Sequence, residues 1–253
     1  LMLIATVVFW MGRKVFIHIP PSGKKFFTET FSTTGLSVLL RLLIIYSFIA
    51  VFWALFDQTG STWVIQAESL DRNWMGINWL PSQIQAINPI MILLLVPIFT
   101  YLIYPSINNK IKKITPLGKI SVGLFLAVPS FLIIGLAQTW IDAGQTPNIY
   151  WQIIAYAILT ASEVLVSITC LEFSYTQAPN NMKSLIMGFF MLSIAIGNIF
   201  TALFTKIMPK SFIIADQFTS SYFYFYSGLM LLTALLFLFI LKYYKHQMNL
   251  HDE

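Results

Sequence analysis

Charged residues are scarce in this 253-residue chain, at 10% of the sequence, whereas ordinary soluble domains carry about 25%. Hydrophobic residues make up 57%, and the mean hydropathy is +0.75. A soluble protein of this size cannot remove so much apolar surface from water. The composition therefore excludes a disordered chain, a nucleic-acid-binding domain and most soluble enzymes, and the net charge of +5 does not indicate nucleic acid as a partner.

Cysteine and histidine are also rare. Cys170 is the single cysteine, which excludes a disulfide within the chain and any metal site built from several cysteines. The three histidines, His18, His246 and His251, lack the spacing of a metalloprotease motif. We therefore expect no metal site.

The chain contains several long stretches of mostly apolar residues. A helix that spans a membrane needs about 20 mostly apolar residues, and two of the stretches of that length contain acids. Pro89, Pro97 and Pro129 lie within such stretches and predict kinks. The sequence thus predicts an all-α membrane protein. Its six spans are expected at about 37–60, 81–104, 120–141, 150–175, 184–205 and 217–241.

The first residues are apolar, but they are too short to cross a membrane. A signal peptide is one interpretation, but no basic region precedes this segment as it would in a signal peptide. We favour the end of a helix that begins outside this sequence. The expected organisation is the end of a transmembrane helix at 1–11, a cytoplasmic connector at 12–36, a six-helix bundle at 37–246 and a cytoplasmic tail at 247–253.

Basic residues are divided unequally between the two sides of the predicted bundle. If the connector is cytoplasmic, Arg72, Lys206 and Lys210 lie on the outer side, and the remaining 12 of the 15 basic residues lie on the cytoplasmic side. Cytoplasmic loops of membrane proteins carry such an excess of Lys and Arg. We expect a multi-pass protein of the plasma (inner) membrane with a cytoplasmic carboxy terminus.

Two acids lie deep within predicted spans. Asp57 follows Arg41 by 16 residues, or about 24 Å of helix, which places Asp57 in the outer half of the membrane. Glu163 follows Tyr150 by 13 residues, or about 20 Å, near the middle of the membrane. An ionised carboxylate in a bilayer is costly, so each acid should face a cavity, find a partner or take a proton. A buried ion pair that fixes helix packing is the structural alternative.

Two polar residues accompany these acids. Asn88 precedes Pro89 in a predicted span, where an amide can either join helices or bind a ligand. Ser167 lies one helical turn after Glu163 and shares its face, although a serine there can also bond to its own helix.

Three separated motifs resemble those of the proton-coupled oligopeptide transporter family, and they occur in the same order. The family's seventh-helix motif is similar to FWALFDQTGS at 52–61, and its eighth-helix element to Asn88-Pro89. Its tenth-helix signature and following loop are similar to Glu163, EFSYTQAP at 172–179 and Met182-Lys183-Ser184. The resemblance covers essentially the whole chain. It implies the major facilitator superfamily fold, in which two six-helix halves enclose a central site, with this chain as the end of helix six through helix twelve.

The resemblance also implies roles for individual residues. Asp57 resembles the seventh-helix acid of proton coupling, whose partner is an arginine on helix one. Glu163 resembles the tenth-helix acid that receives the amino terminus of the peptide, and Asn88 resembles the eighth-helix asparagine that contacts the peptide. By the same resemblance, Ser167, Trp53 and Phe190 match pocket positions, and Arg41 matches an arginine near the inner gate.

The chain departs from the family pattern at two of these places. Phe190 stands where many members have a tryptophan, so it offers no indole N–H donor. Thr100 stands where some members have an aspartate that faces the helix-seven arginine. The first departure bears on side-chain preference, and the second bears on the gate role of Arg41.

The resemblance implies proton-coupled symport of di- and tripeptides, without a metal or organic cofactor. The implied partners are the peptide, protons, the lipid bilayer and the amino-terminal half of the same transporter. One alternative is a related transporter of nitrate or another small organic solute, against which Glu163 argues. Another is a structural membrane protein, which would not need acids at two depths. An intramembrane aspartyl protease would need two facing aspartates, and only Asp57 qualifies, so we expect no enzyme.

Overall fold

The structure of the chain is a computed structural model. It describes residues 28, 30–110, 115–177, 182–214 and 217–249. The expected helix end at 1–11 and most of the expected connector lie outside the described residues, as does the tail after residue 249. Within the described part, six helical segments are long and apolar enough to cross a membrane, which confirms the predicted spans. These segments are Thr33–Glu68, Pro81–Ile107, Pro116–Asp142, Tyr150–Gln177, Lys183–Ile207 and Ser220–Lys242.

The first span consists of three helical pieces. α3 (Thr33–Phe56) begins after Ser32, whose Oγ accepts a hydrogen bond from the backbone N–H of Gly35 at 3.0 Å. Because this oxygen satisfies an N–H that has no helical partner, the helix begins four residues before the predicted span. The 3-10 turn η1 (Asp57–Gly60) and the short helix α4 (Thr62–Glu68) complete the span.

The second span changes its helix type along its length. Pro89 lies in the first turn of α5, where a missing N–H is tolerated, whereas Pro97 lies inside α5 just before the π-helical segment η3. A proline in a helix interior removes one backbone hydrogen bond, which accounts for the altered ladder after Pro97. The pieces of this span are η2 (Pro81–Ala86), α5 (Ile87–Ile98), η3 (Phe99–Ile103) and α6 (Tyr104–Lys110).

Three of the remaining spans are continuous helices, and one is interrupted. The continuous helices are α7 (Pro116–Asp142), α10 (Lys183–Ile207) and α11 (Ser220–Asn249). Pro129 lies inside α7 without ending it. The interrupted span consists of α8 (Tyr150–Glu163), the π-helical segment η4 (Val164–Ile168) and α9 (Thr169–Gln177).

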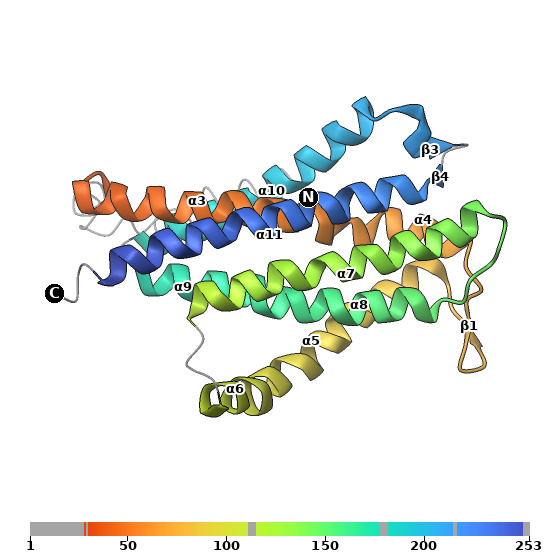
Figure 1. Cartoon of the computed structure of the whole chain (residues 1–253), viewed down its shortest axis with the longest axis horizontal. Helices are drawn as coiled ribbons and strands as arrows, with labels where there is room; N and C mark the ends of the chain where they lie inside the picture. The colour runs from red at the N-terminus through yellow and green to blue at the C-terminus, as the bar shows by residue number, and fades with distance from the viewer. Residues whose placement is uncertain (1–27, 29, 111–114, 178–181, 215–216, 250–253) are drawn as a thin grey trace, which may run out of the picture.

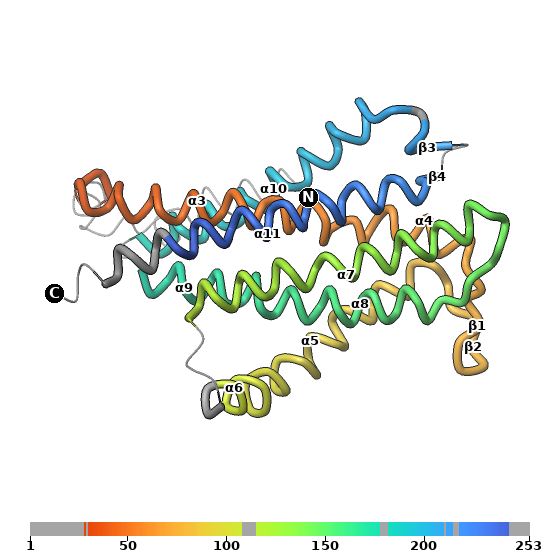
Figure 2. The backbone as a smooth tube through the Cα atoms, viewed as in Figure 1, coloured from red at the N-terminus to blue at the C-terminus, as the bar shows by residue number. Residues whose placement is uncertain are grey.

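Two short antiparallel hairpins lie at one end of the bundle, which we call the hairpin end (Figures 1 and 2). In the first hairpin, Met75 and Gly76 have φ angles of 55° and 77°, as a tight turn with two positive φ values requires. The hairpins pair β1 (Asn73–Trp74) with β2 (Ile77–Asn78), and β3 (Ile213–Ile214) with β4 (Gln217–Phe218). The turn η6 (Lys210–Phe212) precedes β3.

The packed side of the bundle centres on α7, which lies between α8 and α11 (Figure 1). Fully buried aromatic rings fill the space around it: Trp63 contacts Tyr156 and Phe131 at centroid distances of 4.8 and 5.5 Å. Gly123 lets α7 approach η4 closely, because a Cβ there would lie 2.6 Å from Cγ2 of Val166. The core of the chain therefore sits among α3, α4, α7, α8 and α11.

Two segments depart from this packed side. The α5–α6 segment leaves the bundle on one side, and the part of α10 toward the hairpin end leaves it on the other (Figures 1 and 2). Phe99 of η3 packs with Val164 and Leu165 of η4 in a small apolar cluster separate from the main core. The two π-helical segments therefore meet at the place where α5 joins α8.

Candidate functional site

Asn88 and Glu163 meet at the contact between α5 and α8. The Nδ2 of Asn88 donates to Oε2 of Glu163 at 2.8 Å and to Oγ1 of Thr160 at 3.1 Å. Thr160 precedes Glu163 by three residues, so both face the same neighbour on α8, and its hydroxyl donates in turn to the backbone O of Tyr156 at 2.8 Å. The structure thus brings together two of the predicted site residues and adds Thr160, which sequence reasoning did not find.

Asp57 lies where α3 gives way to η1, and it contacts α10. The Nδ2 of Asn198 donates to Oδ2 of Asp57 at 2.7 Å. Asn198 was not among the predicted site residues. Its position in the middle of the uncharged interval 184–205 was the available signal, because amides within apolar spans commonly join helices.

The two acids have similar surroundings. Both are half-buried. Among the described residues, each acid is held by a neutral asparagine amide and not by a cation. The carboxylates have therefore found partners, as their depth predicts, but these contacts are not the buried ion pair that the structural alternative requires.

An aromatic contact lies beside the Asp57 contact. Trp53 of α3 and Phe190 of α10 face each other edge to face, with ring centroids 6.4 Å apart, and Phe56 lies 5.3 Å from Trp53. Trp53 and Phe190 are 8% and 3% exposed, respectively. The Nε1 of Trp53 is buried and has no hydrogen-bond partner among the described residues. A buried indole N–H of this kind calls for a partner from outside them.

The remaining predicted residues lie apart from these contacts. Arg41 is half-buried on α3, about 24 Å of helix before Asp57, so the structure does not bring the two together. Ser167 lies within η4, the π-helical segment that begins at the residue after Glu163. Thr100 is exposed on η3, where its hydroxyl donates to the backbone O of Val96 at 2.8 Å.

The helix distortion after Glu163 is a feature that sequence reasoning missed. The π-helical segment η4 begins at the next residue, and Ser162 Oγ donates to the backbone O of Gly123 at 2.6 Å. Short π-helical segments within α-helices are frequent at functional sites. Here the segment sits between α7, which it contacts at Gly123, and η3, which it contacts through Phe99.

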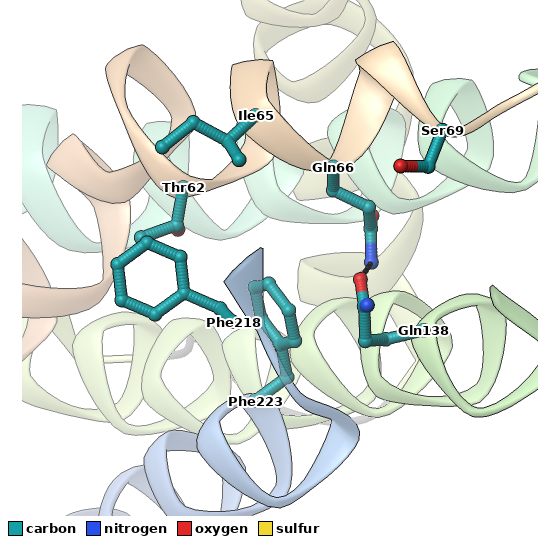
Figure 3. A pocket seen from close by; sticks show the side chains of 7 residues that line it. All are labelled: Thr62, Ile65, Gln66, Ser69, Gln138, Phe218 and Phe223. Carbon is teal, nitrogen blue, oxygen red and sulfur yellow. Dashed lines mark hydrogen bonds between the residues drawn. The ribbon is translucent and has the colours of Figure 1, made fainter. Parts of the chain in front are cut away.

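A small polar cavity lies toward the hairpin end, away from the acids. Figure 3 shows Gln66 of α4 and Gln138 of α7 pointing toward each other, and Nε2 of Gln66 donates to Oε1 of Gln138 at 2.9 Å. Gln138 donates to Asp142 at 3.0 Å, and Asp142 accepts from the backbone N–H of Ser220 at 2.8 Å. The cavity has about 10 Å³, which is room for about one water molecule. These bonds join α4, α7 and α11 and mark a rigid part of the bundle.

Comparison with known proteins identifies a family that matches this chain. A model of the POT family matches residues 33–220, which include all four helices that carry the acids and their asparagines. "Peptide transporter 3" of Caenorhabditis elegans is 49% identical over 107 residues, which are 42% of this chain and 15% of that protein. "Solute carrier family 15 member 1" of Homo sapiens is 36% identical over 107 residues, again 42% of this chain and 15% of that protein.

Solved structures show the same similarity over more of the chain. The crystal structure of the POT family transporter PepTSo matches with a TM-score of 0.75 and 34% identity, over 84% of this chain and 43% of that chain. The crystal structure of an auto-inhibited POT family peptide transporter matches with a TM-score of 0.71 and 32% identity, over 80% of this chain and 40% of that chain. The chain thus spans less than half the length of these transporters, and its helices follow their fold.

Proposed function

This chain belongs to the POT family, and from that premise we propose that it forms the carboxy-terminal half of a proton-coupled symporter of di- and tripeptides. Its six crossing helices and its family make it a multi-pass membrane protein. In this proposal the complete transporter has twelve helices, and the amino-terminal half is the partner of this one. The observation that carries the proposal is the contact of Glu163 with Asn88 between α5 and α8.

Glu163 receives the amino terminus of the peptide in this mechanism. A peptide ammonium loses water when it enters a poorly hydrated cavity, and a charge-assisted hydrogen bond to a carboxylate offsets that loss. Because Asn88 already holds Oε2 of Glu163, the second oxygen of the carboxylate and the amide oxygen of Asn88 are the two acceptors offered to the ammonium. Asn88 thus orients the acid and contributes an acceptor of its own.

Asp57 takes part in proton coupling. Protonation neutralises its carboxylate, whereas deprotonation lets it pair with an arginine of the amino-terminal half. Moving one charge across 100 mV is worth about 2.3 kcal/mol, which is the driving force available for uphill transport. The contact with Asn198 holds Asp57 at the junction of α3 and α10, next to the aromatic contact described above.

The other predicted residues shape the path of the peptide. Trp53 and Phe190 form an aromatic wall, and the buried N–H of Trp53 is offered to a water molecule or to the peptide. Ser167 follows Glu163 along the same span, and Arg41 serves the gate at the opposite end of α3. A site that holds the two ends of a peptide and presents a loosely shaped apolar middle accepts many side chains.

The proposed location is the plasma (inner) membrane, with the hairpin end outside and the carboxy terminus in the cytoplasm. Ser106 of α6 and Thr146 of the loop between α7 and α8 are both exposed, and they lie toward opposite ends of the bundle. Single cysteines at these two positions should react with an impermeant reagent from opposite sides of the membrane. Cys170 is fully buried and should not react. Labelling of both positions from the same side would reject the proposed topology.

Dialanine-driven proton flux tests the function itself. The full-length transporter that contains this chain is reconstituted in liposomes that hold a pH-sensitive dye. We expect dialanine to drive proton movement and an inward proton gradient to concentrate dialanine. A response to nitrate without a response to dialanine would favour the anion-transporting relatives, and a silent protein with intact helical structure would favour a structural role.

A further inference from the structure

We propose that Asn198 is a positioning residue for proton coupling, because its amide fixes the Asp57 carboxylate and ties the protonation of Asp57 to the attachment of α10 on α3. The inference rests on the proposed function, since it assigns Asp57 to coupling. Its basis is the hydrogen bond of 2.7 Å between Nδ2 of Asn198 and Oδ2 of Asp57. This bond joins residues that are 141 positions apart in the chain.

The backbone of α10 is pressed against α3 at this level. A Cβ on Gly197 would collide with the backbone O of Ala50 and would lie 2.9 Å from the backbone N of Ala54, so no side chain fits there. One turn further along α10, Oγ1 of Thr201 donates to the backbone O of Ala54 at 2.9 Å. Asn198 therefore cannot withdraw from Asp57 unless this close contact opens.

The part of α10 beyond Asn198 has few other attachments in the described chain. Ile199 and Leu203 are both 57% exposed and Ile207 is 77% exposed. This part leaves the bundle in Figure 1, and it is attached to α11 by a stacked contact between Phe204 and Phe225 at 4.6 Å. A change at the Gly197–Thr201 contact with α3 is therefore well placed to alter the position of this end of α10.

The chemistry of the amide makes the contact sensitive to the proton. The Nδ2 of Asn198 donates to an ionised carboxylate, whereas a protonated Asp57 is itself a donor and requires the amide oxygen or another acceptor. A proton on Oδ2 therefore turns this bond, and a proton on Oδ1 leaves Oδ2 as a neutral and weaker acceptor, so in both cases the bond from Nδ2 of Asn198 loses strength. Next to Asp57, Tyr156 of α8 donates to the backbone O of Thr59 in η1 at 3.1 Å.

Other charged groups on the elements around η1 lie further away along their helices. The turn η2, which packs against η1, carries no titratable side chain. Glu68 stands at the far end of α4, eleven residues after Asp57, and Lys206 lies two turns beyond Asn198 on α10. Among the described residues, Asn198 is thus the side chain that donates a hydrogen bond to the Asp57 carboxylate.

Substitutions of Asn198 in the full-length reconstituted transporter test this role. Asn198→Leu keeps the branched shape and removes the donor, whereas Asn198→Gln keeps an amide. Because hydrogen bonds to charged groups are the stronger ones, we expect Asn198→Leu to lower proton-driven accumulation of dialanine about tenfold or more. Exchange of dialanine across the membrane without a gradient should stay within about twofold, and Asn198→Gln should restore part of the accumulation. Thr233→Val removes a hydroxyl that bonds to the backbone O of Leu229 within α11, so it is the control and should affect neither measurement by more than about twofold.

A double-mutant cycle separates positioning from packing. If Asn198 acts through Asp57, then Asn198→Leu has little further effect on accumulation or exchange in the Asp57→Asn protein. An equal loss of accumulation and exchange in Asn198→Leu, with no rescue by Asn198→Gln, would show a packing residue and overturn the inference. Failure of the unmodified protein to move protons with dialanine would instead reject the proposed function, and with it this role of Asn198.

Discussion

The second and third spans are almost equally apolar but are packed very differently. The most apolar stretches of Pro81–Ile107 and Pro116–Asp142 have mean hydropathies of 2.2 and 2.3, yet 6% of the first stretch is buried and 61% of the second. α7 is enclosed by α8 and α11, whereas α5 touches the bundle through Asn88 near its beginning and through the small apolar cluster around Phe99 of η3. Hydropathy therefore shows that both helices cross a membrane, but it does not show which of them lies inside the protein.

The same contrast separates α10 from α7. In α10, 22% of the apolar stretch is buried, and a shallow groove of about 460 Å³ runs beside Gly188 and Phe189. Each of the two little-buried helices is attached to the packed side by an asparagine that binds an acid, Asn88 to Glu163 and Asn198 to Asp57. A helix that makes few apolar contacts opens at a lower cost than one in the core. The two acids thus lie at the contacts of the two helices that are least buried in the described bundle.

Replacement of Asp57 is expected to have the largest effect, because it removes the titratable group at the α3–α10 contact. At 100 mV, one coupled charge supports an accumulation ratio of about 50, and in Asp57→Asn we expect this ratio to fall to about one. Exchange of peptide without a gradient should partly survive, since exchange needs no net movement of protons. Uptake into reconstituted vesicles with a proton gradient measures the accumulation ratio, and uptake without a gradient measures exchange. Undiminished uphill uptake by Asp57→Asn would place the coupling elsewhere.

Replacement of Glu163 tests the α5–α8 contact. Glu163→Gln keeps an acceptor for Asn88 but loses the charge that binds the peptide ammonium. Charged hydrogen bonds contribute about 1.5–3 kcal/mol, so we expect the affinity for dialanine to fall about ten- to a hundredfold. Amino-acetylated dialanine carries no ammonium, so it should bind the native protein poorly and lose little more affinity in the variant. Competition binding with both peptides on both proteins measures the four affinities.

The comparison of the two peptides is the decisive part of that test. A loss that is specific to the free ammonium assigns Glu163 to substrate recognition at the contact between the little-buried α5 and α8. If instead both peptides weaken by the same factor, Glu163 holds α5 in place without touching the ammonium. In that case the difference between the little-buried α5 and the enclosed α7 would reflect helix packing and not peptide binding.

The positions of the six spans could be predicted, because uncharged intervals of about 20 residues determine them. The contact of Glu163 with Asn88 was not itself predicted, although the resemblance assigned both residues to contacts with the peptide. Asn198 was missed because an amide in an apolar interval does not reveal which helix it faces. The π-helical segment η4 was missed as well, because the face assigned to Ser167 assumed a continuous α-helix after Glu163. The roles given to the predicted site residues remain predictions: Asp57, Glu163, Asn88, Ser167, Trp53, Phe190 and Arg41.

A pair of glycine substitutions tests the packed side directly. In Gly123→Ala the new Cβ would lie 2.6 Å from Val166 and 2.9 Å from Leu165, so we expect overpacking to lower the free energy of unfolding by about 1–3 kcal/mol. A Cβ on Gly228 of α11 would meet no neighbouring side chain within 4 Å, so Gly228→Ala should be neutral or stabilise by up to about 1 kcal/mol. Thermal unfolding of the purified variants in one detergent checks both. Equal destabilisation would mean that close approach at Gly123 does not hold α7 against η4.

The smallest effect is expected at Thr160, whose Oγ1 is the second acceptor of the Asn88 amide. Thr160→Val keeps the shape of the buried side chain, leaves the bond from Asn88 to Glu163 in place and removes the neutral hydrogen bond from Asn88, together with the bond of the hydroxyl to the backbone O of Tyr156. Such a bond is worth about 0.5–1.5 kcal/mol, so the affinity for dialanine should fall about two- to tenfold while acetylated dialanine is unaffected. Thr139→Val provides the control, because its hydroxyl bonds to Gly135 and Tyr224 on the packed side, and we expect no change in affinity. A loss in Thr160→Val as large as that in Glu163→Gln would mean that the orientation of Asn88, and not the charge of Glu163, limits binding of the peptide. The attachment of α5 would then matter for binding mainly through the amide of Asn88, since loss of its contact with Thr160 would lower the affinity as much as loss of the Glu163 charge.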